Sequence, residues 1–207
     1  MAALTPDDRD LRRQLRRDLR SARRGLNPAE HRRRSNSIAG HAARTLLFWR
    51  ARRFSLFLSA DGEVDTTALM QRLWRRHAEV WLPCLGEPTL RFRRYRPGMR
   101  LRRGAFGIRE PAVGKVRRAR QLDVLLMPLV AFDPCGNRLG MGGGFYDRSL
   151  AFLRHRSRYR RPKLIGVAFD LQRIDALGSA WWDIKLDGVL TESGLHRSVN
   201  RHTGKRA

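Results

Sequence analysis

The sequence is poor in cysteine and contains no long apolar run. Cys84 and Cys135 are the two cysteines among 207 residues, and their spacing matches neither a metal-binding motif nor a disulfide framework. No apolar run reaches the length of a membrane span, and the N-terminal "MAALTPDDRD" lacks the apolar segment of a secretory signal. We therefore expect a cytoplasmic protein that does not enter a membrane.

Acidic residues are scarce as well. The chain has 44 lysine and arginine residues against 19 aspartate and glutamate residues, a formal net charge of +25. A nucleic-acid partner is one interpretation of such a charge. Because the basic residues are mostly arginine and are spread along the whole chain, we favour a compositional bias, or attraction for a small anionic substrate, over nucleic-acid binding.

Length and hydrophobic content fit one soluble domain with a single core. Segments typical of strands alternate with segments typical of helices; the expected strands cover residues 53–59, 79–83, 90–95, 121–133, 163–169 and 187–192. This alternation predicts an α/β fold, a single three-layer α/β/α domain with a mostly parallel central sheet over residues 1–193. We expect a monomer, with a poorly ordered, polar and basic tail at 194–207.

Two helices are expected near the N-terminus. The "TPDD" segment is a helix start signal, and Leu11, Leu15 and Leu19 then recur on one face, which should be buried. The "NPAE" segment predicts a second helix over 28–48, with Leu46 among its inward-facing residues.

A glycine-rich stretch, "NRLGMGGGFYDRSL" at 137–150, follows a segment that reads as a buried strand. Glycines allow backbone N–H groups to form a concave anion-binding nest, and α/β proteins place ligands beyond the carboxyl ends of their strands. Two familiar phosphate loops are excluded, because no Gly-Lys-Ser/Thr ends the stretch and Phe145 replaces the last glycine of a dinucleotide fingerprint. An anion loop is therefore predicted, with a tight turn that binds nothing as the alternative.

Charged residues flank this loop. Arg138 and Arg148 could each bind phosphate oxygens through two hydrogen bonds. Asp147 would repel phosphate unless a magnesium ion lay between them, since Mg²⁺ binds carboxylates together with phosphate oxygens.

The stretch "FDPCGNRLGMGGGFYDRSL" closely resembles the signature of the 5-formyltetrahydrofolate cyclo-ligase family, also called methenyltetrahydrofolate synthetases. Phe145 is its notable departure, since tyrosine is common there. Four other segments resemble family motifs in the same order along residues 9–192: "RRQLR" at 12–16, with Arg12 in a lysine position, "LSADGEVDT" at 58–66, "FGIREP" at 106–111 and "WWDIKLDGVLTE" at 181–192.

The resemblance implies an enzyme that converts 5-formyltetrahydrofolate to 5,10-methenyltetrahydrofolate, using ATP and Mg²⁺ and releasing ADP and phosphate. The formyl oxygen would attack the γ-phosphorus, and N10 of the same folate would then displace phosphate. Since both nucleophiles belong to the substrate, the protein would act by positioning and charge stabilisation.

The resemblance also implies a role for individual residues. ATP contacts would come from Arg12, Arg16, Arg138, Leu139, Gly140, Met141, Gly142, Gly143, Gly144, Phe145 and Tyr146. Folate contacts would come from Arg16, Leu58, Glu63, Met141, Gly142, Gly143, Gly144 and Phe145. The transferred phosphoryl group would be stabilised by Arg138, Arg148 and Tyr146, and Mg²⁺ would be held by Asp147 and Asp187.

Each of these roles has a structural alternative. Arg12 and Arg16 could be exposed helix arginines, and Glu63 could be a helix-capping acid. Asp147 could stabilise a helix dipole, and Asp187 could lie at a strand edge. An RNA-binding module and another ATP-binding α/β enzyme are the alternative functions.

Overall fold

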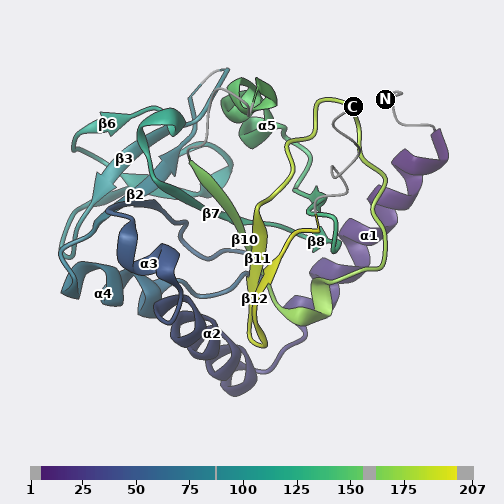
Figure 1. Ribbon diagram of the computed structural model, residues 1–207, viewed down its shortest axis with the longest axis horizontal. Helices are drawn as coiled ribbons and strands as arrows, with labels where there is room; N and C mark the ends of the chain where they lie inside the picture. The colour runs from purple at the N-terminus through teal and green to yellow at the C-terminus, as the bar shows by residue number, and fades with distance from the viewer. Residues whose placement is uncertain (1–5, 87, 156–161, 200–207) are drawn as a thin grey trace, which may run out of the picture.

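A mixed sheet of eight strands forms the centre of the protein (Figure 1). The computed structural model describes residues 6–86, 88–155 and 162–199. From one edge to the other the strands are β12 Gly194–Arg197, β11 Gly188–Thr191, β10 Lys163–Val167, β7 Val124–Pro128, β1 Arg53–Ser55, β2 Glu79–Cys84, β3 Arg91–Tyr95 and β6 Val116–Arg117. The five neighbours from β11 to β2 pair in parallel, whereas β12, β3 and β6 pair antiparallel.

Helices cover both faces of this sheet. The α-helices are α1 Pro6–Arg24, α2 Pro28–Ala43, α3 Leu46–Arg50, α4 Thr67–Arg75 and α5 Phe145–Leu150. In β7, Val124 and Leu126 pack with α2, α3 and α4 on one face, whereas Leu125 and Met127 pack on the other face with α5. Burial on both sides explains the near-continuous apolar run of this strand. The predicted three-layer α/β/α domain with a mostly parallel sheet is confirmed.

Helix α1 lies beside a small hairpin rather than over the sheet (Figure 1). The hairpin consists of β8 (Ala131–Phe132) and β9 (Arg138–Leu139), and Leu15 and Leu19 pack against its apolar core. The prediction for Leu11 was wrong, because its side chain is 55% exposed. Among the described residues, no helix combines the length and the apolar character that crossing a membrane requires.

The second predicted helix is two helices. Helix α2 ends at Ala43, and Thr45 begins α3 by accepting a hydrogen bond from the Phe48 N–H. This break changes which side chains face inward: Phe48 is buried, whereas Leu46 is 69% exposed. The expectation that Leu46 faces inward was therefore wrong, because it assumed one continuous helical period.

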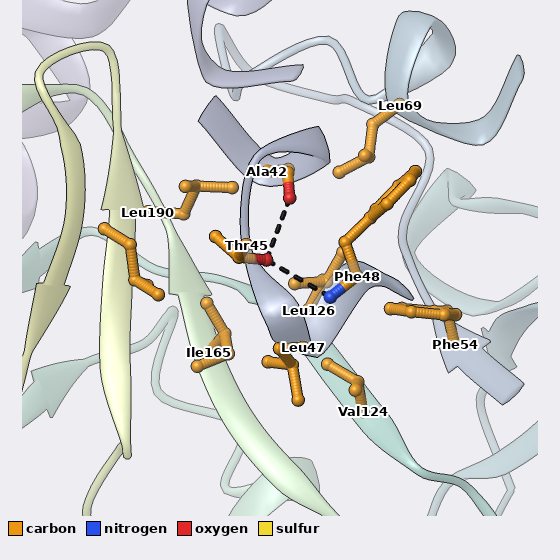
Figure 2. A pocket seen from close by; sticks show the side chains of 11 residues that line it. Ala42, Thr45, Leu47, Phe48, Phe54, Leu69, Val124, Leu126, Ile165 and Leu190 are labelled. Carbon is orange, nitrogen blue, oxygen red and sulfur yellow. Dashed lines mark hydrogen bonds between the residues drawn. The ribbon is translucent and has the colours of Figure 1, made fainter. Parts of the chain in front are cut away.

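An apolar cavity of about 20 Å³ lies beneath α3 (Figure 2). Thr45 supplies the polar side chain in its lining, and that hydroxyl donates to the Ala42 carbonyl oxygen and accepts from the Phe48 N–H. A bound water needs several polar partners, which this lining does not offer. We therefore interpret the cavity as a packing defect.

The predicted boundary of the C-terminal tail needs correction. Residues Gly194–Arg197, assigned to the poorly ordered tail, form β12, which pairs antiparallel with β11. Strand β12 lies at the edge of the sheet and, among the described strands, pairs only with β11. An edge strand can consist largely of polar residues, so the composition of this segment did not reveal the strand. Residues 200–207 of the predicted tail lie outside the described residues.

Replacing a buried core leucine should strongly destabilise the fold. Leu73 of α4 is fully buried, so Leu73→Ala should lower the free energy of unfolding by about 2–5 kcal/mol through lost burial and a new cavity. Leu46→Ala is the matched control and should change it by less than about 0.5 kcal/mol. Urea denaturation measures both values, and equal losses would contradict the packing described for α3 and α4.

Candidate active site

Loops that leave three parallel strands meet at the carboxyl edge of the sheet. The carbonyl oxygen of Leu129, just after β7, accepts hydrogen bonds from Gln172 Nε2 (2.7 Å) and from Arg23 Nη1 (3.3 Å). Gln172 follows β10, and Arg23 belongs to α1 and also binds Asp61, which follows β1. The candidate site is assembled around this junction, at the edge where α/β sheets place ligands.

The glycine loop presents unpaired backbone donors. Gly142 and Gly144 have φ angles of +105° and +63°, which side-chain-bearing residues rarely adopt. Within the described part of the chain, the N–H groups of residues 141–144 donate no hydrogen bond. Met141 is 54% exposed, so this stretch lies at the surface. Such a run of unpaired N–H groups fits the predicted anion loop.

Helix α1 contacts this loop through Arg16. Its Nε donates to the Gly140 carbonyl oxygen (2.9 Å), and a β-carbon on Gly142 would lie 3.8 Å from its guanidinium carbon. Burial, and secondarily the charge of Arg12, lowers the pKa of Arg16. Arg12 itself binds Asp183 (2.9 Å) and the Gly178 carbonyl oxygen. Thus Arg16 meets the glycine loop, whereas Arg12 ties α1 to residues 178–183.

Arg138 is engaged inside the protein. Its Nη2 donates to Asp147 Oδ1 (2.6 Å) and its Nη1 donates to the Ile184 carbonyl oxygen. The Ile184 N–H also donates to Asp147 Oδ1 (3.3 Å). The neighbouring Leu139 is buried in the apolar core beside α1, so any ligand contact it makes must come from its backbone.

Tyr146 connects the glycine loop to Glu63. The tyrosine hydroxyl is buried and has no hydrogen-bond partner among the described residues. Burial chiefly, and then the charge of Glu63, raises the pKa of Tyr146, while Arg138 opposes this. Glu63, predicted from a separate segment, therefore lies within electrostatic reach of Tyr146, as does Arg138.

Glu63 is the most perturbed carboxyl group of the site. Burial raises its pKa to about 7, and Arg23 and the Ala60 N–H only partly offset this effect. Glu63 Oε2 accepts from the Ala60 N–H (3.3 Å), and Oε1 lies 3.9 Å from Arg23 Nη2. A carboxyl group with a strongly shifted pKa at a loop junction is typical of a functional site.

The remaining predicted residues lie around these groups. The Arg148 guanidinium stacks over the Phe145 ring at 4.9 Å and donates from Nε to the Pro88 carbonyl oxygen. A β-carbon on Gly144 would lie 2.8 Å from Arg148 Nη1, so this arginine covers the end of the glycine loop. Leu58 is partly buried against the core on the α2 side of the sheet.

The two predicted magnesium ligands have different surroundings. Asp147 binds Arg138, as described above. Asp187 accepts from the Leu164 N–H (2.7 Å) and pairs with Lys163 (3.3 Å) at the amino ends of β10 and β11. Among the described residues, no group of three or more histidine, cysteine, aspartate or glutamate side chains could hold a metal ion.

Comparison with known proteins identifies the family of the chain. The sequence model of the 5-formyltetrahydrofolate cyclo-ligase family matches residues 8–192. The chain belongs to this family. The 5-formyltetrahydrofolate cyclo-ligase of Haemophilus influenzae is 38% identical over 184 residues, 86% of this chain and 96% of the relative. That of Escherichia coli K12 is also 38% identical, over 84% of this chain and 97% of the relative.

The fold agrees with solved structures as well. The 5,10-methenyltetrahydrofolate synthetase of Aquifex aeolicus superposes with a TM-score of 0.80 and 30% identity, over 95% of this chain and 97% of that chain. The protein is thus a cyclo-ligase by family. The predicted family membership, enzyme class and fold are confirmed.

Arg23 and Asp61 were missed by sequence reasoning. Arginine recurs along α1 at positions 12, 16, 20 and 23, and Asp61 precedes Gly62, so Arg23 and Asp61 both look like surface residues in the sequence. Arg23 is nevertheless buried, and three arginines surround Asp61. The spacing of these arginines could have placed Arg23 on the same helix face as Arg16, but the sequence does not show what that face packs against.

The raised pKa of Glu63 predicts a pH-dependent stability difference. An unfolded glutamate titrates near 4.5, so the folded protein binds more protons between about pH 4.5 and pH 7. As the pH rises from about 4.5 to about 7, the free energy of unfolding of the wild type should therefore fall relative to that of Glu63→Gln, by on the order of 3 kcal/mol in total. Urea denaturation across the window measures the difference.

Glu30→Gln is the control for this experiment. Hydrogen bonds from Arg33 and Arg34 hold the pKa of Glu30 below its usual value, so folding does not favour protonation of this carboxyl group. As the pH rises through the window, Glu30→Gln should therefore not gain stability relative to the wild type, whereas Glu63→Gln should. A Glu63→Gln curve parallel to the wild-type curve would contradict the burial described for Glu63.

Proposed function

We propose that the protein catalyses the ATP- and Mg²⁺-dependent cyclisation of 5-formyltetrahydrofolate to 5,10-methenyltetrahydrofolate, with release of ADP and phosphate. The observation that carries the proposal is the convergence of an unpaired glycine loop, Arg16, Tyr146 and Glu63 in a chain of the cyclo-ligase family. One chain supplies every group, so we expect the enzyme to act as a monomer.

The triphosphate would bind along the glycine loop. The N–H groups of residues 141–144 are free to donate to phosphate oxygens, and Arg16 places a positive charge beside them. Arg148 lies over the end of the same loop. Fixed donors of this kind stabilise the charge that develops on a transferred phosphoryl group.

The folate would bind on the Glu63 side. An ionised carboxylate accepts two hydrogen bonds and so suits the adjacent N–H groups of a pterin ring. Those hydrogen bonds would favour the charged form and lower the pKa of Glu63 from its value near 7. The buried Tyr146 hydroxyl, which has no partner among the described residues, would gain one from the substrate.

Between these two sides the chemistry requires alignment. The formyl oxygen attacks the γ-phosphorus and ADP leaves, which yields an iminium phosphate. N10 then attacks the carbon of the former formyl group and loses its proton, and the bond between that carbon and the phosphorylated oxygen breaks to release phosphate. The protein contributes no nucleophile. It would accelerate the first step by aligning the formyl oxygen with the γ-phosphorus and its ADP leaving group, and the second step by holding N10 against the formyl carbon.

The residues present fit magnesium that arrives with ATP better than a resident metal site. Asp147 can offer one carboxylate oxygen, since Arg138 and Ile184 engage its Oδ1. The hydrogen bonds described for Asp187 use both of its oxygens. One carboxylate plus phosphate oxygens suffices for Mg²⁺. When bound, Mg²⁺ would neutralise charge on the phosphates.

Turnover provides the direct test of the function. The wild-type protein mixed with 5-formyltetrahydrofolate, ATP and Mg²⁺ should develop the absorbance of methenyltetrahydrofolate, and omitting ATP should abolish the signal. ATP hydrolysis without folate turnover would instead favour another ATP-dependent reaction and refute the proposal.

Glycine substitutions test the site within the same assay. Gly142→Ala forces an unfavourable φ on the loop and should raise the KM for ATP at least about 10-fold. Gly98→Ala is the matched control, because Gly98 also has a positive φ (+77°) but lies in a turn with open space around it. The control should leave the KM for ATP unchanged, and equal effects would contradict the assigned loop.

The magnesium requirement separates the two aspartates. Asp147→Asn should raise the Mg²⁺ concentration needed for half-maximal rate about 10-fold, because the amide is a weaker ligand. Asp187→Asn should lower the melting temperature through the lost pairing with Lys163 and leave the Mg²⁺ requirement unchanged. A raised requirement in both variants would show that Asp187 also serves the metal.

A further inference from the structure

Arg23 is buried in a chain whose arginines are mostly at the surface. Its side chain is 1% exposed, and it ranks among the largest fully buried side chains of the protein. Burying a guanidinium group is costly unless its donors are bonded and its charge is balanced. The partners of this group therefore indicate which parts of the fold it holds together.

The guanidinium binds two loops at once. Nε donates to the Asp61 carbonyl oxygen (2.8 Å), and Nη2 donates to Asp61 Oδ2 (2.9 Å). Nη1 donates to the Leu129 carbonyl oxygen (3.3 Å). Asp61 belongs to the loop after β1, and Leu129 directly follows β7 on the way to the β8–β9 hairpin and the glycine loop. One planar group thus joins the Glu63 loop to the chain that leads to the glycine loop.

The turn that Arg23 holds is strained and tightly packed. Asp61 has a φ of +51°, a left-handed conformation that is uncommon for a residue with a side chain. Gly62 has a φ of +73°, and a β-carbon there would lie 3.2 Å from the Arg23 carbonyl oxygen. Arg20 and Arg24 add ion pairs to Asp61 at 2.7 Å and 3.4 Å. Such a conformation persists where surrounding contacts enforce it.

Helix α1 also contacts the glycine loop itself. Arg16, which binds the Gly140 carbonyl oxygen, precedes Arg23 by seven residues. Seven residues are about two helical turns, so both side chains lie on one face, separated by about 10 Å along the axis. The helix therefore spans the distance from the glycine loop to the Asp61 turn.

We propose that Arg23 is a positioning residue, which fixes the Glu63 carboxyl group relative to the glycine loop so that folate and triphosphate are held in register. This role rests on the proposed function. The planar fork is what the role requires, because three donors in fixed directions reach two different loops. A lysine would keep the charge but could not hold Asp61 and Leu129 in the same geometry.

The charge of Arg23 has a second consequence at Glu63. Its guanidinium lies 3.9 Å from Glu63 Oε1 and partly offsets the effect of burial on the pKa of that carboxyl group. The other charges acting on this carboxyl group are Asp61, which raises its pKa, and Arg20, which lowers it. A shift of the charge at Arg23 away from Glu63 should therefore raise this pKa further.

Arg23→Lys tests the proposal, with Arg24→Lys as the matched control. Arg24 is the neighbouring arginine, pairs with the same aspartate and has a side chain that is 53% exposed. The dissociation constant for 5-formyltetrahydrofolate without ATP and the KM for each substrate are measured for both variants. Arg23→Lys should weaken folate binding and raise the folate KM about 10- to 100-fold, with the ATP KM within about twofold of the wild type.

Carboxyl carbon NMR of Glu63 adds a readout that is independent of turnover. The Glu63 pKa should rise in Arg23→Lys and stay at its wild-type value in Arg24→Lys. Asp61→Asn is the second variant if Arg23→Lys does not fold; it keeps the carbonyl acceptor, removes the charged partner and should weaken folate binding in the same way.

Two results would overturn the proposal. One is a folded Arg23→Lys protein whose folate affinity and Glu63 pKa equal those of the wild type. The other is an equal loss of affinity for folate and ATP with a lower melting temperature, which would show a purely structural role. Absence of turnover by the wild type would refute the proposed function instead, and the folate-binding and NMR measurements would still decide the role of Arg23.

Discussion

The parallel pairing of the five central strands determines where polar side chains gather in this protein. Parallel strands end at a common edge, and both faces of this sheet are covered by apolar cores. The loops that leave β1, β7 and β10 therefore meet beyond the same edge. Glu63, Leu129 and Gln172 are far apart in the sequence, and the strand order brings their loops together.

Helix α1 turns this junction into a site. Leu15 and Leu19 attach it to the β8–β9 hairpin, and its arginines then face the loops at the sheet edge. Arg16 meets the glycine loop, and Arg23 meets the Asp61 turn. A buried guanidinium group is tolerated only where its donors find acceptors, and for Arg23 the acceptors are two carbonyl oxygens and one carboxylate from separate loops.

The electrostatics of the site follow from burial. Desolvation raises the pKa of both Glu63 and Tyr146, and the charge of Glu63 raises the pKa of Tyr146 further. Unpaired donors of the glycine loop and an unpaired tyrosine hydroxyl lie nearby. A buried hydroxyl without a partner in the described part of the fold is costly, so a polar ligand that pairs with Tyr146 would bind favourably. The glycine-loop donors lie at the surface and would exchange water for the ligand. The positive charge of the chain as a whole adds attraction for anionic substrates.

The sequence by itself determined the α/β class and a buried strand within residues 121–133, which the structure places at 124–128, because these rest on local composition and periodicity. It also predicted an anion loop at residues 140–144 from glycine's conformational freedom. Family motifs in the sequence identified the family. The tertiary structure alone decided that α2 ends at Ala43, that residues 194–197 pair as a strand, and that Arg23 is buried. Those outcomes depend on which surfaces meet, and burial and pairing between distant segments leave no periodic trace in the chain.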